Sequence, residues 1–176
     1  IDEILDLSKI ESGKMTLELH TVPVKEITQD MQMLFGEIAK EKNLELEITT
    51  KNLEMETLYT DKLRVEQILR NLLSNALKFT SEGKVSLDIS SDKDKGKVYF
   101  KVTDTGIGIA KEKIQMVFEA FQQADGSTQR KYGGTGLGLS ISRELSRLLG
   151  GEINLSSEEG KGSTFTLIIP INATLP

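Results

Sequence analysis

One stretch in the middle of the chain carries polar side chains at a spacing that could do chemistry. Asn71 and Asn75 lie four residues apart and Lys78 follows three residues later, so a helix would place all three on one face. Asparagine is unfavourable in a helix interior, which makes two on one face unusual. Amide oxygens can ligate Mg²⁺ together with waters and phosphate oxygens, and a lysine can neutralise phosphate charge. Taken alone, this polar line, which Arg64 and Gln67 extend, is equally compatible with a solvated helix face.

The second candidate is an apolar stretch that ends in a carboxylate. Residues 102–109 read VTDTGIGI, in which Asp104 is followed by Gly106 and Gly108. Asp104 can simply cap the turn after a strand. Alternatively, its carboxylate accepts a hydrogen bond from an amine on a flat ligand, while the two glycines let the ring lie against bare backbone. The motif alone is compatible with both interpretations.

The third candidate is the glycine-rich stretch YGGTGLGL, residues 132–139, which runs directly into a predicted helix. Backbone N–H groups and the positive end of the helix dipole favour phosphate binding at such a place. No Gly-Lys-Ser/Thr follows, so the stretch is not the phosphate loop of a P-loop NTPase. A dinucleotide-binding fold would carry its glycines in the first βα unit of the chain.

In their order along the chain, these motifs resemble the catalytic ATP-binding domain of two-component sensor histidine kinases, within the ATPase group that includes DNA gyrase and the Hsp90 chaperones. Residues 71–79 (NLLSNALKF) are similar to the family's N box and 104–108 (DTGIG) to its first glycine box. Residues 117–121 (VFEAF) are similar to the F box and 134–138 (GTGLG) to the second glycine box. The resemblance extends over residues 17–170, nearly the whole chain.

The resemblance implies a role for each motif. Asp104 would bind the exocyclic amine of adenine, with Gly108 making room for the ring. Asn75 would be the Mg²⁺ ligand, and Asn71 would line the same phosphate site. The other residues that it implies for nucleotide binding are Lys78, Phe79, Gly106, Ile109, Phe121, Lys131, Gly134, Thr135, Gly136, Leu137, Gly138 and Ser163.

Three further assignments come from the same resemblance. Arg130 or Lys131 would reach the γ-phosphate, so Arg130 joins Asn71 and Lys78 as an expected catalytic residue. Ser163 would support Asp104 through its hydroxyl. The segment 110–133 would be a mobile ATP lid, whose start Phe118 and Phe121 would anchor.

One position separates the subclasses of this ATPase group. The resemblance implies that members that hydrolyse ATP carry a glutamate four residues before the Mg²⁺ asparagine, where this chain has Asn71. An amide cannot take a proton from water at neutral pH, so Asn71 favours phosphoryl transfer to a histidine over hydrolysis. An ATP-hydrolysing chaperone or topoisomerase module is the alternative enzyme class. A nucleotide-binding scaffold without transfer activity is the non-enzymatic alternative.

The only histidine, His20, is expected to be an ordinary residue at the end of a strand. The resemblance places the acceptor histidine on a separate dimerisation domain. Residues 1–13 resemble the end of the last helix of that domain, and residues 14–176 would form the catalytic domain. We therefore expect the chain alone to be a monomer that does not phosphorylate itself. The parent protein is expected to be a homodimer that passes the phosphoryl group on to a response regulator or receiver domain.

The composition excludes several other kinds of protein. The 176 residues contain no cysteine and one histidine, which excludes disulfides, thiolate metal sites and cysteine nucleophiles. A formal net charge of −5 argues against a nucleic-acid partner. No apolar run has the length of a transmembrane helix. We expect a cytoplasmic domain whose parent is either free or anchored in the inner membrane.

The elements that must position these motifs follow from hydrophobic periodicity. Helices are expected at 1–12, 24–42, 61–79 and 137–149, and strands at 15–19, 44–48, 58–60, 85–89, 98–102, 153–155 and 165–169. Helices and strands alternate without a regular βαβ rhythm, so we expect an α+β fold. Its architecture would be a two-layer α/β sandwich, the Bergerat ATP-binding fold, with a mixed, mainly antiparallel sheet and helices on one face.

Overall fold

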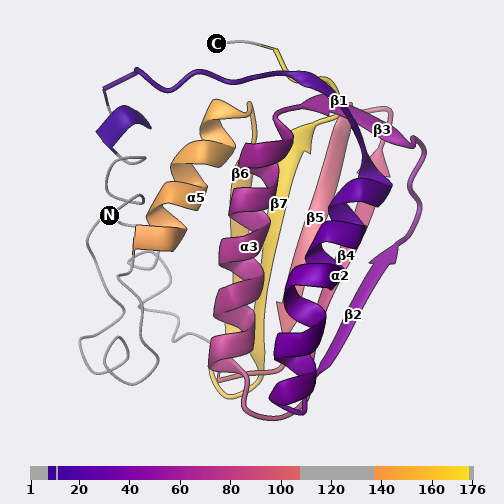
Figure 1. The fold of residues 1–176 in the computed structure, drawn as a ribbon, viewed down its shortest axis with the longest axis vertical. Coiled ribbons are helices and arrows are strands. Elements are labelled where there is room, and N and C mark those ends of the chain that lie inside the picture. Colours follow the sequence, from indigo (N-terminus) through magenta and orange to yellow (C-terminus); the bar gives the residue numbers. More distant parts are fainter. Residues whose placement is uncertain (1–7, 11, 108–136, 175–176) are drawn as a thin grey trace.

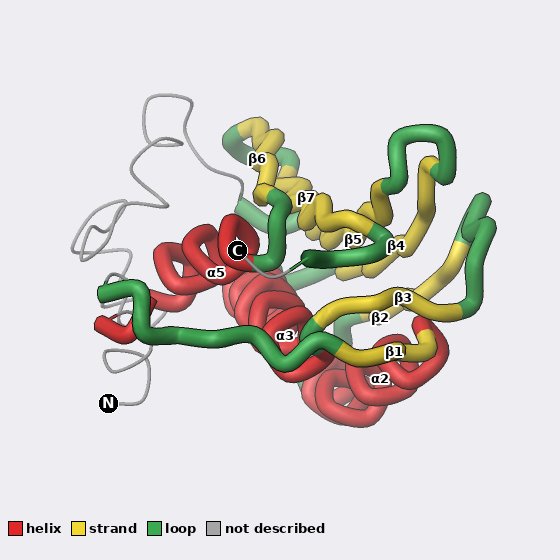
Figure 2. Tube along the Cα trace, turned by 90° about the horizontal axis from the view of Figure 1, so that it is seen from above, coloured by secondary structure: helices red, strands yellow, loops and turns green. Residues whose placement is uncertain are grey.

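Helices α2, α3 and α5 cover one face of a five-stranded sheet in the computed structural model, which describes residues 8–10, 12–107 and 137–174 (Figure 1). Seen from above, these helices all lie on the same side of the strands (Figure 2). The helices span Val24–Glu41 (α2), Lys62–Phe79 (α3) and Leu137–Leu148 (α5). The expected two-layer α+β architecture is confirmed.

The sheet is mixed and mainly antiparallel, as expected. Its order is β2-β4-β5-β7-β6, in which only the β2–β4 pair is parallel. The strands span Glu45–Thr50 (β2), Lys84–Asp92 (β4), Lys97–Asp104 (β5), Glu152–Glu158 (β6) and Gly162–Pro170 (β7). The central strand β5 pairs with β4 on one side and with β7 on the other, so the end of β5 is held by hydrogen bonds from both sides.

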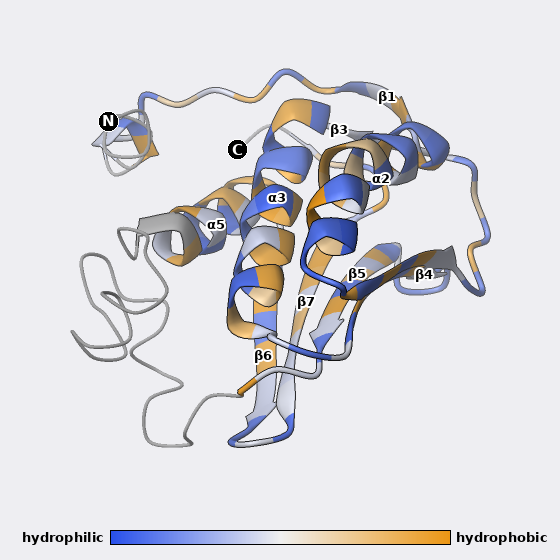
Figure 3. Cartoon of the chain, turned by 60° about the horizontal axis from the view of Figure 1, so that its bottom comes forward, coloured by the Kyte–Doolittle hydropathy of each residue, from blue (hydrophilic) through white to orange (hydrophobic). Residues whose placement is uncertain are grey.

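The core lies between the sheet and the helices. Each helix turns an apolar stripe toward the strands, and Figure 3 shows the hydrophobic and hydrophilic stripes alternating along α2 and α3. The fully buried large side chains come from both layers: Phe100, Ile27, Met31, Leu58, Ile68, Leu69, Leu72, Leu73, Leu87, Ile89, Ile141 and Leu145. This two-sided burial is the main stabilising contribution, since each such side chain is worth about 1.5–3 kcal/mol when removed from water.

The N-terminal segment differs from the sequence-based expectation. Residues 14–19 form no strand; the first strand is β1 (His20–Pro23), which pairs antiparallel with β3 (Thr57–Thr60) in a small separate sheet. The alternating burial of Met15 and Leu17 has another cause: the segment crosses the start of α3, where the Glu18 N–H donates to the Asp61 carboxylate at 2.9 Å. Period-two burial therefore reflects one-sided packing here, without a partner strand.

That carboxylate also begins α3, as expected. Asp61 is the N-cap of the helix, and its Oδ1 accepts from the Arg64 N–H at 3.2 Å. Of the expected N-terminal helix, residues 8–10 are helical and residues 1–7 and 11 lie outside the described part. No helix in the described ranges is long and apolar enough to cross a membrane.

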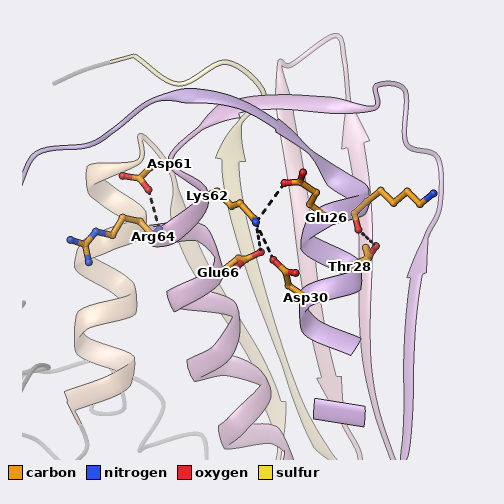
Figure 4. Close-up of polar contacts among 8 residues, drawn as sticks. Glu26, Thr28, Asp30, Asp61, Lys62, Arg64 and Glu66 are labelled. Atoms are coloured by element: carbon orange, nitrogen blue, oxygen red, sulfur yellow. Dashed lines mark hydrogen bonds and ion pairs between the residues drawn. The ribbon is translucent and has the colours of Figure 1, made fainter. Parts of the chain in front are cut away.

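A charged cluster joins α2 to α3 on the side of α3 that carries Glu66 (Figure 4). The Lys62 Nζ lies 3.1 Å from Asp30 Oδ2, 3.5 Å from Glu26 Oε2 and 4.0 Å from Glu66 Oε2. Desolvation, followed by a hydrogen bond with Asp30, raises the pKa of Glu66 to about 7. The hydrogen bond with Glu66 and that with Lys62 lower the pKa of Asp30. At neutral pH, Glu66 is thus close to its titration midpoint while Asp30 is ionised.

Glu66→Gln should make the domain more stable at about pH 8 and change little at about pH 5. The pKa of Glu66 is higher in the folded chain than in the unfolded chain, so folding favours the protonated carboxyl. The contribution of this carboxyl to folding stability is fully present below the unfolded pKa of 4.5 and is lost as pH rises through the folded pKa of about 7. Glutamine keeps a donor for Asp30 without the cost of ionisation. One pKa unit corresponds to about 1.4 kcal/mol, so we expect a gain of at least about 1 kcal/mol at the higher pH in urea unfolding.

The control is Glu37→Gln on the exposed face of α2, which should show no such pH dependence. A Glu66→Gln variant with the same stability difference at both pH values would contradict the assignment.

Candidate functional site

The end of β5 carries the carboxylate that the sequence singled out. Asp104 is the last residue of β5 and is only 6% exposed. Its Oδ1 accepts from the Gly106 N–H at 2.9 Å, and a backbone hydrogen bond from Ser163 also reaches the carboxylate. Desolvation raises the pKa of Asp104, while these two N–H groups act in the opposite direction. The turn-capping role of Asp104 is therefore real, and it holds the carboxylate in place.

The turn after Asp104 lies directly against the last residues of α3. The Ile107 N–H donates to the Phe79 carbonyl oxygen at 3.3 Å. A Cβ at Gly106 would lie 2.3 Å from that same oxygen and 2.9 Å from the Thr80 hydroxyl oxygen, so only glycine permits this approach. Gly106 therefore serves the contact between β5 and α3. This brings Asp104 next to the helix end that carries Lys78 and Phe79.

Strand β7 supports the carboxylate from the other side. Ser163 is buried and lies opposite Asp104 in the β5–β7 register. The hydroxyl of Ser163 lies 2.8 Å from the Ser157 hydroxyl, while the backbone N–H is the group that reaches Asp104. The expectation drawn from the resemblance named the hydroxyl of Ser163 for this contact. Here a main-chain group makes it, because the strand register already brings that N–H to the carboxylate.

The polar line of α3 lies along a helix that packs against α5. Arg64 Nη1 donates to Gln67 Oε1 at 2.8 Å, and Asn71 Nδ2 donates to Ser142 Oγ on α5 at 3.1 Å. Asn71 and Asn75 are partly buried and Lys78 is exposed. Most of the line is thus engaged with the protein, and it becomes solvent-exposed only at Lys78, beside the turn that follows Asp104.

Glu66 lies on another side of α3, facing the cluster on α2. It is the only carboxylate in the helix. The side of α3 that carries Asn71 and Asn75 therefore offers amide groups and no carboxylate.

Several predicted site residues lie outside the described part of the chain. These are Gly108, Ile109, Phe118, Phe121, Arg130, Lys131, Gly134, Thr135 and Gly136, together with the predicted lid 110–133. Leu137 and Gly138 begin α5. The described site therefore consists of the end of β5, the end of α3 and the facing residues of β7 and α5.

Sequence reasoning missed two side chains at this junction. Ser142 is fully buried and contacts Asn71, and Thr80 is fully buried beside Gly106 at the end of α3. A serine at a buried position of an amphipathic helix signals a polar contact, but periodicity does not identify the partner. Thr80 directly follows residues 71–79, which match the N box. It is buried by the turn after β5, a contact that the local sequence does not reveal.

The arrangement combines two chemistries. The buried carboxylate can accept hydrogen bonds from a ring amine, and the amides and the exposed lysine of α3 suit an anionic group with its cation. Within the described ranges, no group of three or more His, Cys, Asp or Glu residues could hold a metal by itself. The buried carboxylate and the polar end of α3 suit a ligand that has an amine-bearing ring at one end and an anionic group at the other.

Comparison with known proteins agrees with this geometry. A family model described as histidine kinase-, DNA gyrase B- and HSP90-like ATPase matches residues 60–173. The sensor histidine kinase GacS of Pseudomonas protegens is 40% identical over 177 residues, covering 99% of this chain and 19% of GacS. LuxQ of Vibrio cholerae, an autoinducer 2 sensor kinase/phosphatase, is 36% identical, covering 97% of this chain and 20% of LuxQ. The chain therefore spans about a fifth of the length of these curated relatives.

Solved structures give the same result for the fold. Full-length ShkA in complex with AMPPNP superposes with a TM-score of 0.85 at 32% identity, covering 99% of this chain and 36% of ShkA. A nucleotide-free catalytic domain of the histidine kinase ThkA superposes with a TM-score of 0.74 at 27% identity. That match covers 89% of this chain and 97% of the ThkA chain.

Gly106→Ala should destabilise the domain because its Cβ would meet a backbone carbonyl that cannot move away without separating β5 from α3. Such overpacking typically costs about 1–3 kcal/mol. The control is Gly36→Ala on α2, whose Cβ would meet only the end of the flexible Gln32 side chain. Alanine there should be neutral or stabilising, since glycine inside a helix costs about 0.5–1 kcal/mol. Urea unfolding measures both variants, and a Gly106→Ala variant as stable as the parent would refute the close approach.

Proposed function

We propose that this chain, which belongs to the histidine kinase-, DNA gyrase B- and HSP90-like ATPase family, binds Mg²⁺-ATP and donates its γ-phosphoryl group to a histidine on a dimerisation domain of the same protein. The chain is a catalytic domain of the sensor histidine kinase type. The observation that carries the proposal is the buried Asp104 carboxylate, fixed by backbone N–H groups beside the polar end of α3.

Asp104 would recognise the adenine ring. Its carboxylate can only accept hydrogen bonds when ionised, and the exocyclic amine of adenine can only donate. The N–H groups of Gly106 and Ser163 favour the ionised form and leave the carboxylate further acceptor capacity. ATP would therefore be distinguished from GTP, whose ring presents a carbonyl oxygen at the corresponding position.

The phosphate end would lie along α3. Mg²⁺ usually binds through one or two protein oxygens and completes its shell with waters and substrate phosphates. The amide of the partly buried Asn75 can supply such an oxygen. Lys78, exposed one turn further on, would neutralise phosphate charge. When bound, Mg²⁺ would stabilise the charge that develops on the transferred group.

Transfer is favoured over hydrolysis by the side chains of α3. A general base for water has to accept a proton at neutral pH, which an amide cannot do. Asn71 stands where the hydrolysing members of the group would have a glutamate. The only carboxylate of α3, Glu66, is engaged with Lys62 and Asp30. An ATP-hydrolysing module is the alternative, and sustained phosphate release from the isolated chain would favour it.

The acceptor would lie elsewhere in the parent protein. His20 is exposed at the start of β1, where its Nδ1 lies 3.1 Å from the Glu18 carbonyl oxygen. This strand position differs from the dimerisation helix on which the acceptor is expected. In the proposal, residues 1–13 end a helix of the dimerisation domain, and the parent is a homodimer that uses ATP in the cytoplasm. The phosphoryl group would then pass to a response regulator or receiver domain.

Asp104→Asn should weaken ATP binding because it replaces half of the acceptor capacity with donors. A hydrogen bond to a charged group contributes about 1.5–3 kcal/mol, which corresponds to a roughly 10–150-fold loss of affinity. Titration calorimetry with Mg²⁺-ATP measures the loss. The control is Asp94→Asn in the exposed β4–β5 turn, which makes the same change in charge. Unchanged affinity of Asp104→Asn would reject adenine recognition by this carboxylate.

Asn75→Ala should remove the part of ATP affinity that depends on Mg²⁺ and leave the fold intact, because Asn75 lies outside the apolar stripe of α3. ATP affinity measured with Mg²⁺ should then match the affinity measured with EDTA, whereas the parent chain should show a clear difference. A variant that unfolds would instead indicate that the polar line of α3 is structural. Thermal unfolding of the same sample separates the two results.

A further inference from the structure

A side-chain hydrogen bond links α3 to α5 at the level of the site. Asn71 Nδ2 on α3 donates to Ser142 Oγ on α5 at 3.1 Å. Ser142 is completely buried and Asn71 is partly buried, so water competes little for this contact. Asn71 precedes Asn75 by four residues, which is one turn of the same helix face. The contact therefore acts on the side chain next to the proposed Mg²⁺ ligand.

The hydrogen bond to Ser142 fixes the orientation of the whole Asn71 amide group. The nitrogen and the oxygen of a primary amide point in different directions from one planar group, so fixing the nitrogen also fixes the direction of the oxygen. With Nδ2 donating to α5, the acceptor oxygen of Asn71 is the end of the amide directed elsewhere. A fixed acceptor favours one arrangement of the metal–phosphate group over others, because less rotamer freedom remains to be lost on binding.

Another buried serine of α5, Ser146, provides a matched control for Ser142. Ser146 lies one turn after Ser142, is also completely buried, and donates through its Oγ to the Arg143 carbonyl oxygen at 2.6 Å within its own helix. Ser146 therefore needs no partner on α3. Packing alone would accept alanine at either position, since alanine has the higher helix propensity. Ser142 differs in that its hydroxyl serves a side chain of the neighbouring helix.

We propose that Ser142 is a positioning residue for the phosphate end of the site: its hydroxyl holds the Asn71 amide so that α3 presents its oxygen acceptors to the metal–phosphate group of the nucleotide. The inference rests on the proposed function, since it assumes that α3 meets Mg²⁺-ATP. It adds a residue of α5 that touches neither the nucleotide nor the metal and acts only through Asn71.

The test compares Ser142→Ala with Ser146→Ala in the whole chain. Affinities are measured by calorimetry for Mg²⁺-ATP and for adenosine, which has the ring but no phosphates. A neutral hydrogen bond contributes about 0.5–1.5 kcal/mol, so Ser142→Ala should weaken Mg²⁺-ATP binding about 2–12-fold and leave adenosine binding unchanged. Ser146→Ala should change neither affinity. A purely structural role would lower both affinities together, along with the melting temperature.

Two further comparisons test whether Ser142 acts through Asn71 and whether the hydroxyl or the volume of its side chain matters. In an Asn71→Ala background, Ser142→Ala should have no additional effect on Mg²⁺-ATP affinity, because the side chain through which it acts is gone. The isosteric pair Ser142→Thr and Ser142→Val differs only in the hydroxyl, so the threonine variant should bind Mg²⁺-ATP more tightly than the valine variant. This pair decides the question even where Ser142→Ala fails to fold.

The results distinguish failure of the positioning role of Ser142 from failure of the proposed ATP-binding function. If the unsubstituted chain does not bind ATP, both the proposed function and the positioning role are wrong. Parent chain that binds Mg²⁺-ATP, together with a Ser142→Ala variant of equal affinity, would overturn only the positioning role. Equal losses for adenosine and Mg²⁺-ATP, or an undiminished effect of Ser142→Ala in the Asn71→Ala background, would overturn it as well.

Discussion

A carboxylate buried away from water has to be stabilised by hydrogen-bond donors, because an unpaired charge in such a place is very costly. Asp104 meets this condition at the end of the central strand, with one N–H from the turn that follows it and one from β7. The β5–β7 register brings Ser163 opposite Asp104, and the glycine at 106 lets the turn reach the end of α3. The β5–β7 pairing and the contact between the Gly106 turn and α3 therefore place the Asp104 carboxylate next to the polar end of α3.

Helix α3 separates structural from functional chemistry by the direction of its side chains. Its apolar stripe packs on the sheet, Glu66 and Lys62 join it to α2, and Asn71 joins it to α5. The titrating carboxylate is thereby kept away from the amides proposed to meet the phosphates. This separation matters for the reaction, since a carboxylate beside the phosphates would provide a base for water. The proposed transfer of a phosphoryl group to a histidine benefits from the absence of a carboxylate at this place.

Most of the fold could be predicted from the sequence because its elements have clear periods. The stripes of α2 and α3, the Asp61 cap and the hairpin of β4 and β5 all follow from local patterns, and all are confirmed. The strand predicted at 15–19 was wrong because alternating burial against the start of α3 has the same period as a strand. Asp104 could be recognised as a candidate from its place before two glycines. The contacts of Ser142 and Gly106 join residues far apart in sequence, which no local pattern encodes.

A crystal structure of the chain with Mg²⁺ and a non-hydrolysable ATP analogue would show whether Asp104 and α3 bind the two ends of one Mg²⁺-ATP molecule. We expect the adenine amine to donate to the Asp104 carboxylate and the Asn75 amide oxygen to ligate the Mg²⁺ ion held by the phosphates. An adenine ring bound away from Asp104, or a metal ion with no ligand from α3, would contradict this expectation.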